Sequence, residues 1–429
     1  MQLSQWVLVG LLAMPAVLAA QAAPMKAIQG ELDRIYPALD ALYLDLHQHP
    51  ELSGQEVKTA VKMADQMRKA GFEVTTDVGG TGVVGVLRNG QGPTLLLRTE
   101  LDALPVQEKT GLAYASQEPG VMHACGHDLH MTTLTGAASV LNRLRDRWRG
   151  TLVLVAQPAE ETVGGARAMI ADGLFTRFPR PDFALAIHDS GSVPAGRIAW
   201  VEGYAYANVD SVDITLFGKG GHGAAPHTTV DPIVLAARTI LALQTLIARE
   251  KDPMEPGVIT VGSIHAGNKH NIIPDEARLQ LTVRSYAPAV RKQLLDGIVR
   301  IVKAEATAGH SPREPLIAFS EGQDALYNDP AFTRRLVAAI GKGLGPDNVV
   351  AGKAVMGAED FGEFGKAAGI PSAMLSLGAV EPVRFKAALA SGEALPSPHS
   401  PLFAPDRERS IRTGAEALIL AALEVLAVP

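Results

Sequence analysis

Residues 151–161 read TLVLVAQPAEE, a short apolar run that turns polar and ends in two adjacent glutamates. Two other apolar runs, 94–97 and 183–187, lead in the same way into Arg98, Glu100 and Asp102 and into His188. Short runs that are apolar throughout are typical of strands buried on both faces of a parallel sheet. Because ligands bind beyond the carboxyl ends of such strands, we expect the three polar segments to meet in one crevice.

The order of predicted elements indicates two kinds of domain. Helical periodicity accompanies the apolar runs, and alternating strands and helices favour an α/β domain with a mixed, largely parallel sheet. Past residue 205 the pattern becomes strand, helix, strand, strand, helix, strand, at residues 209–217, 231–249, 257–264, 277–284, 289–306 and 316–319. This order is typical of a ferredoxin-like α+β unit. Helix-and-strand material returns after residue 330, so the ferredoxin-like unit is predicted to be an insertion.

A chain of 429 residues exceeds the usual size of one hydrophobic core. The predicted organisation is a metal-binding catalytic domain formed by 25–204 and 320–429, with an inserted lid domain at 205–319. Residues 1–24 are predicted to be a signal peptide. Their apolar core, 6–20, is too short to span a membrane, and Ala20-Gln21-Ala22 is a small-x-small cleavage site.

The signal prediction places the protein in the periplasm or outside the cell. Residues 1–5 contain no Lys or Arg, so a buried N-terminal helix is the alternative. No later segment is expected to be long and apolar enough to cross a membrane. The net charge of −6, without a basic run, argues against nucleic acid as a partner. It does not exclude an anionic small substrate, since one Arg can bind a carboxylate.

The segment 123–130, HACGHDLH, contains the only cysteine of the chain, Cys125, so no intramolecular disulfide can form. One glycine separates Cys125 from His127, close enough for both to bind the same metal site. Together with Glu161 and His188 they make a donor set that suits Zn2+, and Mn2+ or Co2+ is compatible with it. A lone Cys-x-His is a weak signal, and a lone His after a strand is more often a core residue. The combination favours a metal site.

Glu160 and Glu161 are the most informative pair. Adjacent carboxylates on one loop repel each other unless a cation lies nearby or one of them holds a proton. One could bind metal while the other accepts a proton from the attacking water, the division of labour that metal-assisted amide hydrolysis requires. A solvated acidic loop is the alternative, but the flanking Gln157-Pro158 and Gly164-Gly165 fit it poorly.

Several longer motifs carry a family resemblance. They are HQHPEL (47–52), LDALP (101–105), MHACGHD (122–128), QPAEE (157–161), GGH (220–222), NIIP (271–274), GAEDF (357–361) and HSP (399–401). They resemble the aminoacylase, hippurate hydrolase and auxin-amino acid conjugate hydrolase branch of a metallopeptidase family that also contains carboxypeptidase G. The resemblance spans the mature chain in order.

The resemblance implies a role for each matching residue. It implies a site for two divalent ions, Zn2+ or Mn2+ with Co2+ also compatible, whose ligands are Cys125, His127, Glu161, His188 and His399. Glu160 would be the general base and Asp102 would orient a ligand. In the inserted domain His222 would polarise the scissile carbonyl, and Asn271, Arg284 and Gly357 would bind substrate, with Arg284 on its carboxylate. The alternatives are a surface strand residue for Arg284 and a turn-capping residue for Asn271.

The predicted function is hydrolysis of the amide bond of small N-acyl amino acids. A dipeptidase or carboxypeptidase on the same scaffold is one alternative, and a catalytically silent metal- or peptide-binding envelope protein is another. The inserted-domain residues would reach the chemistry by domain closure or from a partner subunit, so a homodimer through that domain is also expected.

Four features depart from the family pattern. Glu100 stands where Asp is usual, Asp-Ser-Gly-Ser follows His188, Lys269-His270 precedes Asn271, and Phe385–Ser397 is longer than the usual segment before His399. The first changes the reach of the side chain more than its chemistry. The second concerns the rim of the site and the third the choice of substrate.

Overall fold

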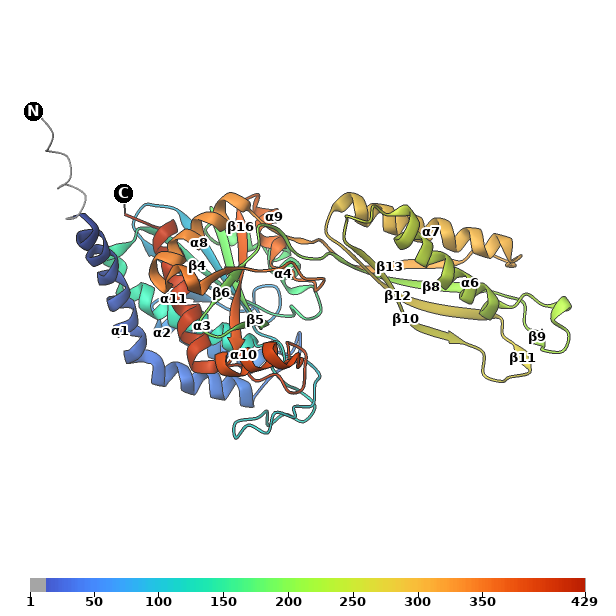
Figure 1. The fold of residues 1–429 in the computed structure, drawn as a ribbon, viewed down its shortest axis with the longest axis horizontal. Coiled ribbons are helices and arrows are strands. Elements are labelled where there is room, and N and C mark those ends of the chain that lie inside the picture. Colours follow the sequence, from blue (N-terminus) through green and yellow to red (C-terminus); the bar gives the residue numbers. More distant parts are fainter. Residues whose placement is uncertain (1–12, 429) are drawn as a thin grey trace, which may run out of the picture. The chain divides into compact units, whose positions relative to one another are not determined.

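The computed structural model describes the backbone of residues 13–428 and the side chains from Met25 onward, Glu321 excepted. Residues 1–12 of the predicted signal segment lie outside the described residues. The described chain divides into two compact units, shown in Figure 1. The first unit contains the residues up to Gly203, Asn328–Lys353 and those from Glu363 onward, and the second unit contains Tyr204–Tyr327 and Ala354–Gly362.

The first unit is built on an eight-stranded sheet with the order β1-β2-β4-β3-β5-β16-β6-β15. Its strands are β1 (Glu73–Thr75), β2 (Val83–Asn89), β3 (Thr94–Glu100), β4 (Gly150–Gln157), β5 (Phe183–Pro194), β6 (Ile198–Trp200), β15 (Val349–Ala351) and β16 (Ser372–Val380). The central strands β4, β3, β5 and β16 are parallel, whereas β1, β2 and β6 pair antiparallel with their neighbours toward the centre. The predicted mixed, largely parallel sheet is therefore confirmed.

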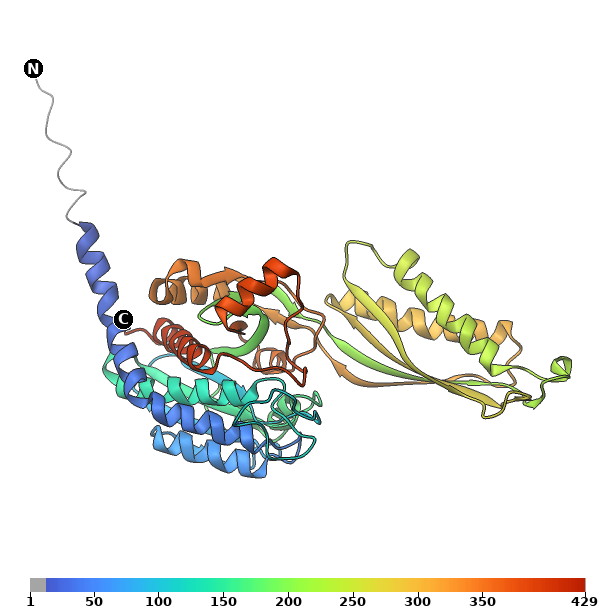
Figure 2. The ribbon, with the colours of Figure 1, turned by 60° about the horizontal axis from the view of Figure 1, so that its bottom comes forward.

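Helices surround this sheet, and α1, α3 and α11 lie side by side in Figures 1 and 2. The helices of the first unit are α1 (Ala13–Gln48), α2 (Val57–Lys69), α3 (His127–Arg143), α4 (Gly165–Ala171), α5 (Leu174–Arg177), α8 (Pro330–Leu344), α9 (Gly362–Ala368), α10 (Pro382–Ser391) and α11 (Arg407–Val425). Almost every residue of α3 is buried, so α3 is the central helix of the core. This matters for function, because α3 begins at His127.

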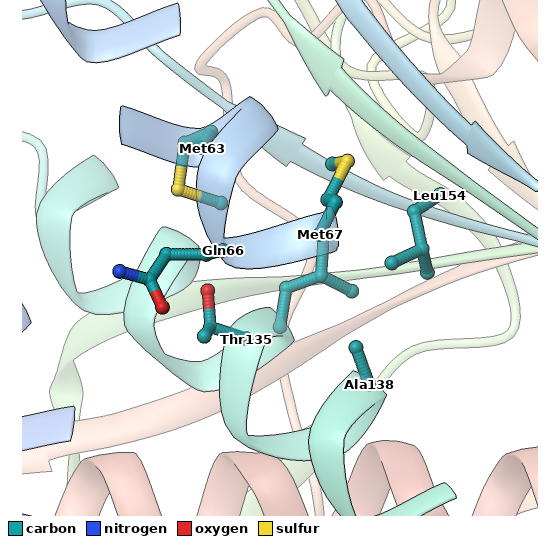
Figure 3. Close-up of a pocket in the computed structure, with 7 residues that line it drawn as sticks. Met63, Gln66, Met67, Thr135, Ala138 and Leu154 are labelled. Carbon is teal, nitrogen blue, oxygen red and sulfur yellow. The ribbon is translucent and has the colours of Figure 1, made fainter. Parts of the chain in front are cut away.

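A second helix, α2, packs on the same core. Figure 3 shows the seam where Met63 and Met67 of α2 face Ala138 of α3 and Leu154 of β4. All four side chains belong to the main hydrophobic cluster. The seam is nearly all apolar and holds α2 against the sheet.

The second unit has the predicted ferredoxin-like order. Its main elements are β8 (Val209–Phe217), α6 (Pro232–Thr245) continued by a π-helical turn (Leu246–Glu250), β10 (Gly257–Ala266), β12 (Glu276–Ser285), α7 (Pro288–Ala308) and β13 (Leu316–Gln323). The four strands pair antiparallel in the order β10-β12-β8-β13. Figure 2 shows α6 and α7 on one face of this sheet. Two short pairs complete the unit, β9 (Gly221–His222) with β11 (Ile272–Ile273) and β7 (Gly203–Tyr206) with β14 (Leu326–Asn328).

Local chemistry explains these elements. Along β12 the residues Ala277, Leu279, Leu281 and Val283 are buried in the core under the helices, as the two-residue period of a strand requires. Arg284 alternates with them and therefore projects from the opposite face. At the start of α6, Asp231 accepts hydrogen bonds from the backbone N–H groups of residues 233 and 234 and caps the helix.

Helix α6 corrects one expectation from the sequence. With its π-helical turn it covers 19 residues, Pro232–Glu250, and by length and composition alone it could cross a membrane. Exposed apolar residues on its outer side, Ile233, Val234 and Leu241, add to the buried leucines and raise its mean hydropathy. Leu235, Leu243 and Leu246 nevertheless belong to the core of the second unit, which gives them a packing role.

Other elements escaped prediction. The three-residue strands β1, β6 and β15 are too short to show an alternating pattern. Strand β5 runs to Pro194 instead of ending at residue 187, because it stays paired with β16 as far as Val380. Tertiary pairing, not local pattern, sets these limits.

The end of α1 is held by a buried charged residue. His47 Nδ1 lies 2.6 Å from Asp128 Oδ2 and its Nε2 lies 3.4 Å from Glu108 Oε1. Burial lowers the pKa of His47, but the hydrogen bonds to Asp128 and Glu108 outweigh it and raise that pKa to about 9. His47 thus joins α1 to the loop after β3 and to the first turn of α3.

This network predicts a pH-dependent stability. A histidine whose pKa rises on folding stabilises the fold fully below its unfolded pKa, and the stabilisation is lost as pH rises through the folded pKa. We expect His47→Gln to lower the free energy of unfolding relative to the wild type by an amount that is constant below about pH 6.5. The part of this difference that comes from the charge of His47 is on the order of 3 kcal/mol, and it should be lost as the pH rises to about 9. Urea unfolding across this pH range measures it, with the exposed His265→Gln as control. A pH-independent difference would contradict it.

Candidate metal centre

The predicted metal ligands meet at one end of the parallel sheet in the first unit. Glu161 follows β4, His188 lies on β5, and Cys125 and His127 flank the start of α3. Gly126, between the last two, has φ 73°, a left-handed conformation that glycine adopts without steric cost. His399 comes from the loop before α11, where its backbone N–H donates to the Ala124 carbonyl over 2.7 Å.

The donor atoms form groups of metal-binding size. Cys125 Sγ lies 3.4 Å from His188 Nε2, and Glu161 Oε2 lies 3.5 Å from His399 Nε2. The other oxygen, Glu161 Oε1, is 4.0 Å from His127 Nε2. Glu161 thus belongs to two groups, one with Cys125 and His399 and one with His127 and Glu160, each with its donor atoms within 4.8 Å of one another. A carboxylate shared between two groups suits a pair of neighbouring cations.

Both buried imidazoles are held in the tautomer that a metal ligand needs. His127 Nδ1 donates to the Asp102 carbonyl over 2.7 Å, and His188 Nδ1 donates to the Asp189 carbonyl over 2.8 Å. With the proton on Nδ1, the lone pair of each ring lies on Nε2. His127 Nε2 belongs to the group with Glu160 and Glu161, and His188 Nε2 lies 3.4 Å from Cys125 Sγ. A hydrogen bond of this kind to the far nitrogen is the usual support of a metal-binding histidine.

The residues present fit divalent cations. His127 Nε2 and Glu161 Oε1 are buried and have no hydrogen-bond partner among the described residues, which is costly for polar atoms unless an ion contacts them. Burial, together with the Glu161 carboxylate, raises the pKa of the Cys125 thiol well above its usual value. The thiolate that binds metal therefore needs a cation beside it.

Asp102 positions two of the predicted metal ligands but does not belong to the predicted ligand set itself. Its backbone carbonyl holds His127, and its Oδ2 accepts hydrogen bonds from Ser53 Oγ (2.7 Å) and from the Glu161 backbone N–H (2.9 Å). One residue thus fixes the positions of a histidine and a carboxylate from different elements.

Behind the predicted ligands lies a cluster of buried charged residues for which the sequence patterns predicted no role. His130 Nδ1 lies 3.0 Å from Glu100 Oε2, and its Nε2 lies 3.0 Å from Asp189 Oδ1, while Arg98 pairs with Glu100. Burial lowers the pKa of His130, but Glu100 and Asp189 raise it to about 9. A sequence signal existed, because His130 lies one helical turn after His127. Its partners come from other strands, which spacing could not reveal.

The second unit brings its predicted residues together only in pairs. His222 on β9 lies beside Asn271, whose carbonyl accepts the Gly223 N–H over 2.9 Å. At the other end of β12, Arg284 Nη1 donates to the Met356 carbonyl over 3.2 Å, next to Gly357. At about 3.3 Å per residue, the eight-residue step along β12 from Glu276 to Arg284 alone covers roughly 26 Å. Figure 1 shows β9 and β11 at one end of this sheet.

The hydrogen bond that the His222 ring accepts decides which of its nitrogens carries the proton. Its Nδ1 accepts the Ala224 backbone N–H over 3.0 Å, so in the neutral ring the proton lies on Nε2. His222 can therefore donate a hydrogen bond from Nε2 to a substrate oxygen.

The chain is similar to several known hydrolases and peptidases. The chain is 40% identical to the hippurate hydrolase of Campylobacter jejuni over 282 residues, 66% of this chain and 71% of that protein. It is also 40% identical to thermostable carboxypeptidase 1 of Saccharolobus solfataricus over 324 residues, 74% of this chain and 80% of that protein. A solved dinuclear metal-binding M20 peptidase of Bacillus subtilis matches with TM-score 0.77 and 28% identity, covering 92% of this chain and 99% of that one.

The family assignment rests on the greater part of the chain. Residues 96–416 match the family described as peptidase family M20/M25/M40, a span that includes every predicted metal ligand. The resemblance noted in the motifs is thereby confirmed. The chain belongs to peptidase family M20/M25/M40 and is a hydrolytic enzyme.

Proposed function

We propose that this protein cleaves the amide bond of N-acyl amino acids, releasing a carboxylic acid and a free amino acid. The observation that carries the proposal is the largely buried Cys, His and Glu donor set, in which a second carboxylate, Glu160, shares a group with His127 and Glu161. The similarity to a hippurate hydrolase supports this substrate class. A catalytically silent binding protein would not need Glu160 beside a complete donor set.

The residues divide the chemistry among them. Divalent cations held by Cys125, His127, Glu161, His188 and His399 would polarise the acyl carbonyl and make the attacking water more acidic. Glu160 Oε2 lies 3.8 Å from His127 Nε2, so it can take the proton of a water that attacks beside this group. Glu160 then gives that proton to the amine nitrogen as the C–N bond breaks. His222 donates from Nε2 to the oxygen on which negative charge develops.

Arg284 is the proposed anchor for the carboxylate of the amino acid half. A guanidinium offers two parallel N–H donors to a carboxylate, and the bond to the Met356 carbonyl orients it. The roughly 26 Å along β12 exceeds the length of a small N-acyl amino acid, so one second unit cannot supply both Arg284 and His222 to the same substrate. This separation favours a homodimer through the inserted domain, in which a second copy supplies either His222 with Asn271 or Arg284 with Gly357.

A carboxypeptidase or dipeptidase activity is the second candidate. The identity to a thermostable carboxypeptidase favours it, since that protein matches over a longer span than the hippurate hydrolase does. A panel of N-acetyl amino acids, N-benzoyl amino acids and unblocked dipeptides separates the two. Cleavage of unblocked dipeptides alone would overturn the N-acyl amino acid proposal.

Export is a further part of the proposal. The apolar run at 6–20 and the small-x-small sequence at 20–22 support it. N-terminal sequencing of the protein recovered from the periplasm or medium tests it, and an intact residue 1 in cytoplasmic material would contradict it.

The division of labour between the two glutamates predicts different metal contents. Glu160→Gln should keep bound metal and lose about 10²- to 10⁴-fold in kcat, because only proton transfer is removed. Glu161→Gln should lose metal as well as activity. Metal analysis of both purified variants measures the difference, and chelation followed by Zn2+, Mn2+ or Co2+ should abolish and restore wild-type activity. Equal metal contents in the two variants would show that base and ligand are wrongly assigned.

The proposed anchor predicts a substrate-dependent effect. Arg284→Lys should raise KM for N-acyl amino acids by the equivalent of about 1.5–3 kcal/mol, because Lys lacks the planar fork, and should leave metal content unchanged. The matching N-acyl amino acid amides, which lack the carboxylate, should be poor wild-type substrates and lose little more. Steady-state kinetics on acid and amide pairs provide the measurement. Equal losses on both would show that Arg284 only supports the fold.

A further inference from the structure

Glu56 is a buried carboxylate outside the proposed metal site. It has no exposed surface and stands at the N-cap position of α2, yet its side chain makes no capping hydrogen bond to that helix. A buried carboxylate is costly unless hydrogen-bond donors surround it. Its partners therefore show what it stabilises.

Those partners connect α2 to the loop that carries the proposed base. Glu56 Oε1 accepts the backbone N–H groups of Gly54 (2.7 Å) and Ala159 (2.9 Å). Glu56 Oε2 accepts the hydroxyl of Thr81 over 2.7 Å. Ala159 directly precedes Glu160, so the carboxylate holds the peptide group next to the base.

The loop needs such support. Ala159 and Val163 have φ 50° and 55°, left-handed conformations that cost a non-glycine residue about 1–2 kcal/mol each. Inside the loop the Val163 N–H donates to the Glu160 carbonyl and the Gly165 N–H to the Ala159 carbonyl. These bonds close the turn on itself but do not fix its direction.

Two carboxylates from outside the loop fix that direction. Glu56 holds the N–H of Ala159, and Asp102 holds the N–H of Glu161 over 2.9 Å. Glu160 lies between these two held amides. Asp102 also contacts a metal-ligand histidine, whereas none of the contacts described for Glu56 involves a proposed ligand, so its effect on Glu160 can be measured separately.

We infer that Glu56 is a positioning residue for Glu160: by holding the Ala159 amide it keeps the left-handed turn that aims the Glu160 carboxylate. The inference rests on the proposed role of Glu160 as base. It depends on the oxygen atoms of Glu56 as acceptors and does not require its charge.

The chain offers variants that separate these possibilities. Glu56→Gln keeps Oε1 as acceptor for both amides, and its amide group can donate to the Thr81 hydroxyl. Glu56→Met has a similar length but no strong acceptor, and Glu56→Asp withdraws the oxygens by about one C–C bond, roughly 1.5 Å. Glu51→Met is the matched control, because Glu51 Oε2 accepts the N–H (2.8 Å) and hydroxyl (2.9 Å) of Thr59 and supports α2 instead of the loop.

The experiment measures kcat, KM, metal content and amide hydrogen exchange of residues 159–165 in the full-length protein. Glu56→Gln should stay within about threefold of the wild-type kcat, whereas Glu56→Met should lose on the order of 10²-fold, the effect of misplacing a reacting group by about 1 Å. KM should change less than kcat. Exchange in the loop should rise in Glu56→Met and stay at the wild-type level in Glu56→Gln and Glu51→Met. Should Glu56→Met fail to fold, Glu56→Asp takes its place, with an intermediate loss and faster loop exchange.

Three outcomes would overturn the inference. Equal losses in Glu56→Gln and Glu56→Met would show that charge matters and the hydrogen bond does not. An equal loss of kcat in Glu51→Met would reduce Glu56 to general support of α2. Unchanged loop exchange in Glu56→Met and Glu56→Asp would show that Glu56 does not hold the turn. Because exchange needs no substrate, this last result is independent of whether the wild type hydrolyses N-acyl amino acids.

Discussion

The parallel pairing of β3 with β4 and β5 is the constraint on which the metal centre depends. The register places Glu100 beside Gln157 and Arg98 beside Ala186, so β3 and β4 end level with the part of β5 that carries His188 and Asp189. Strands β3 and β4 then lead into loops whose charged residues lie within a few ångströms of those on β5. A register shift of one residue would turn these side chains to the other face, and the donor groups would be lost.

Concentrating so much charge in a buried place is unfavourable unless the charges compensate one another. The structure meets this requirement in two ways. Behind the donors, His130 lies between Glu100 and Asp189, and Arg98 neutralises Glu100. Among the donors themselves, His127 Nε2 and Glu161 Oε1 have no hydrogen-bond partner in the part of the chain that the structure describes, and cations would satisfy them. The same desolvation strengthens every electrostatic interaction with a bound substrate.

The second unit follows different rules. Its antiparallel sheet has helices on one face, and its proposed substrate residues lie on the other face or at the sheet ends. Antiparallel strands tolerate a polar face, so residues such as Arg284 can vary there without affecting the core. The proposed substrate-binding residues and the proposed metal ligands thus lie in units with separate hydrophobic cores.

Local sequence patterns were sufficient for the class of fold and the ferredoxin-like insertion, because apolar periodicity is a property of neighbouring positions. They were not sufficient for β6 and β15, whose three residues show no period, or for the length of β5, which its pairing with β16 sets. Nor could they reveal that Glu56 holds Ala159 across 103 positions, or that Asp189 meets His130. Such contacts join residues far apart in the chain, and only the folded backbone brings them within hydrogen-bond distance.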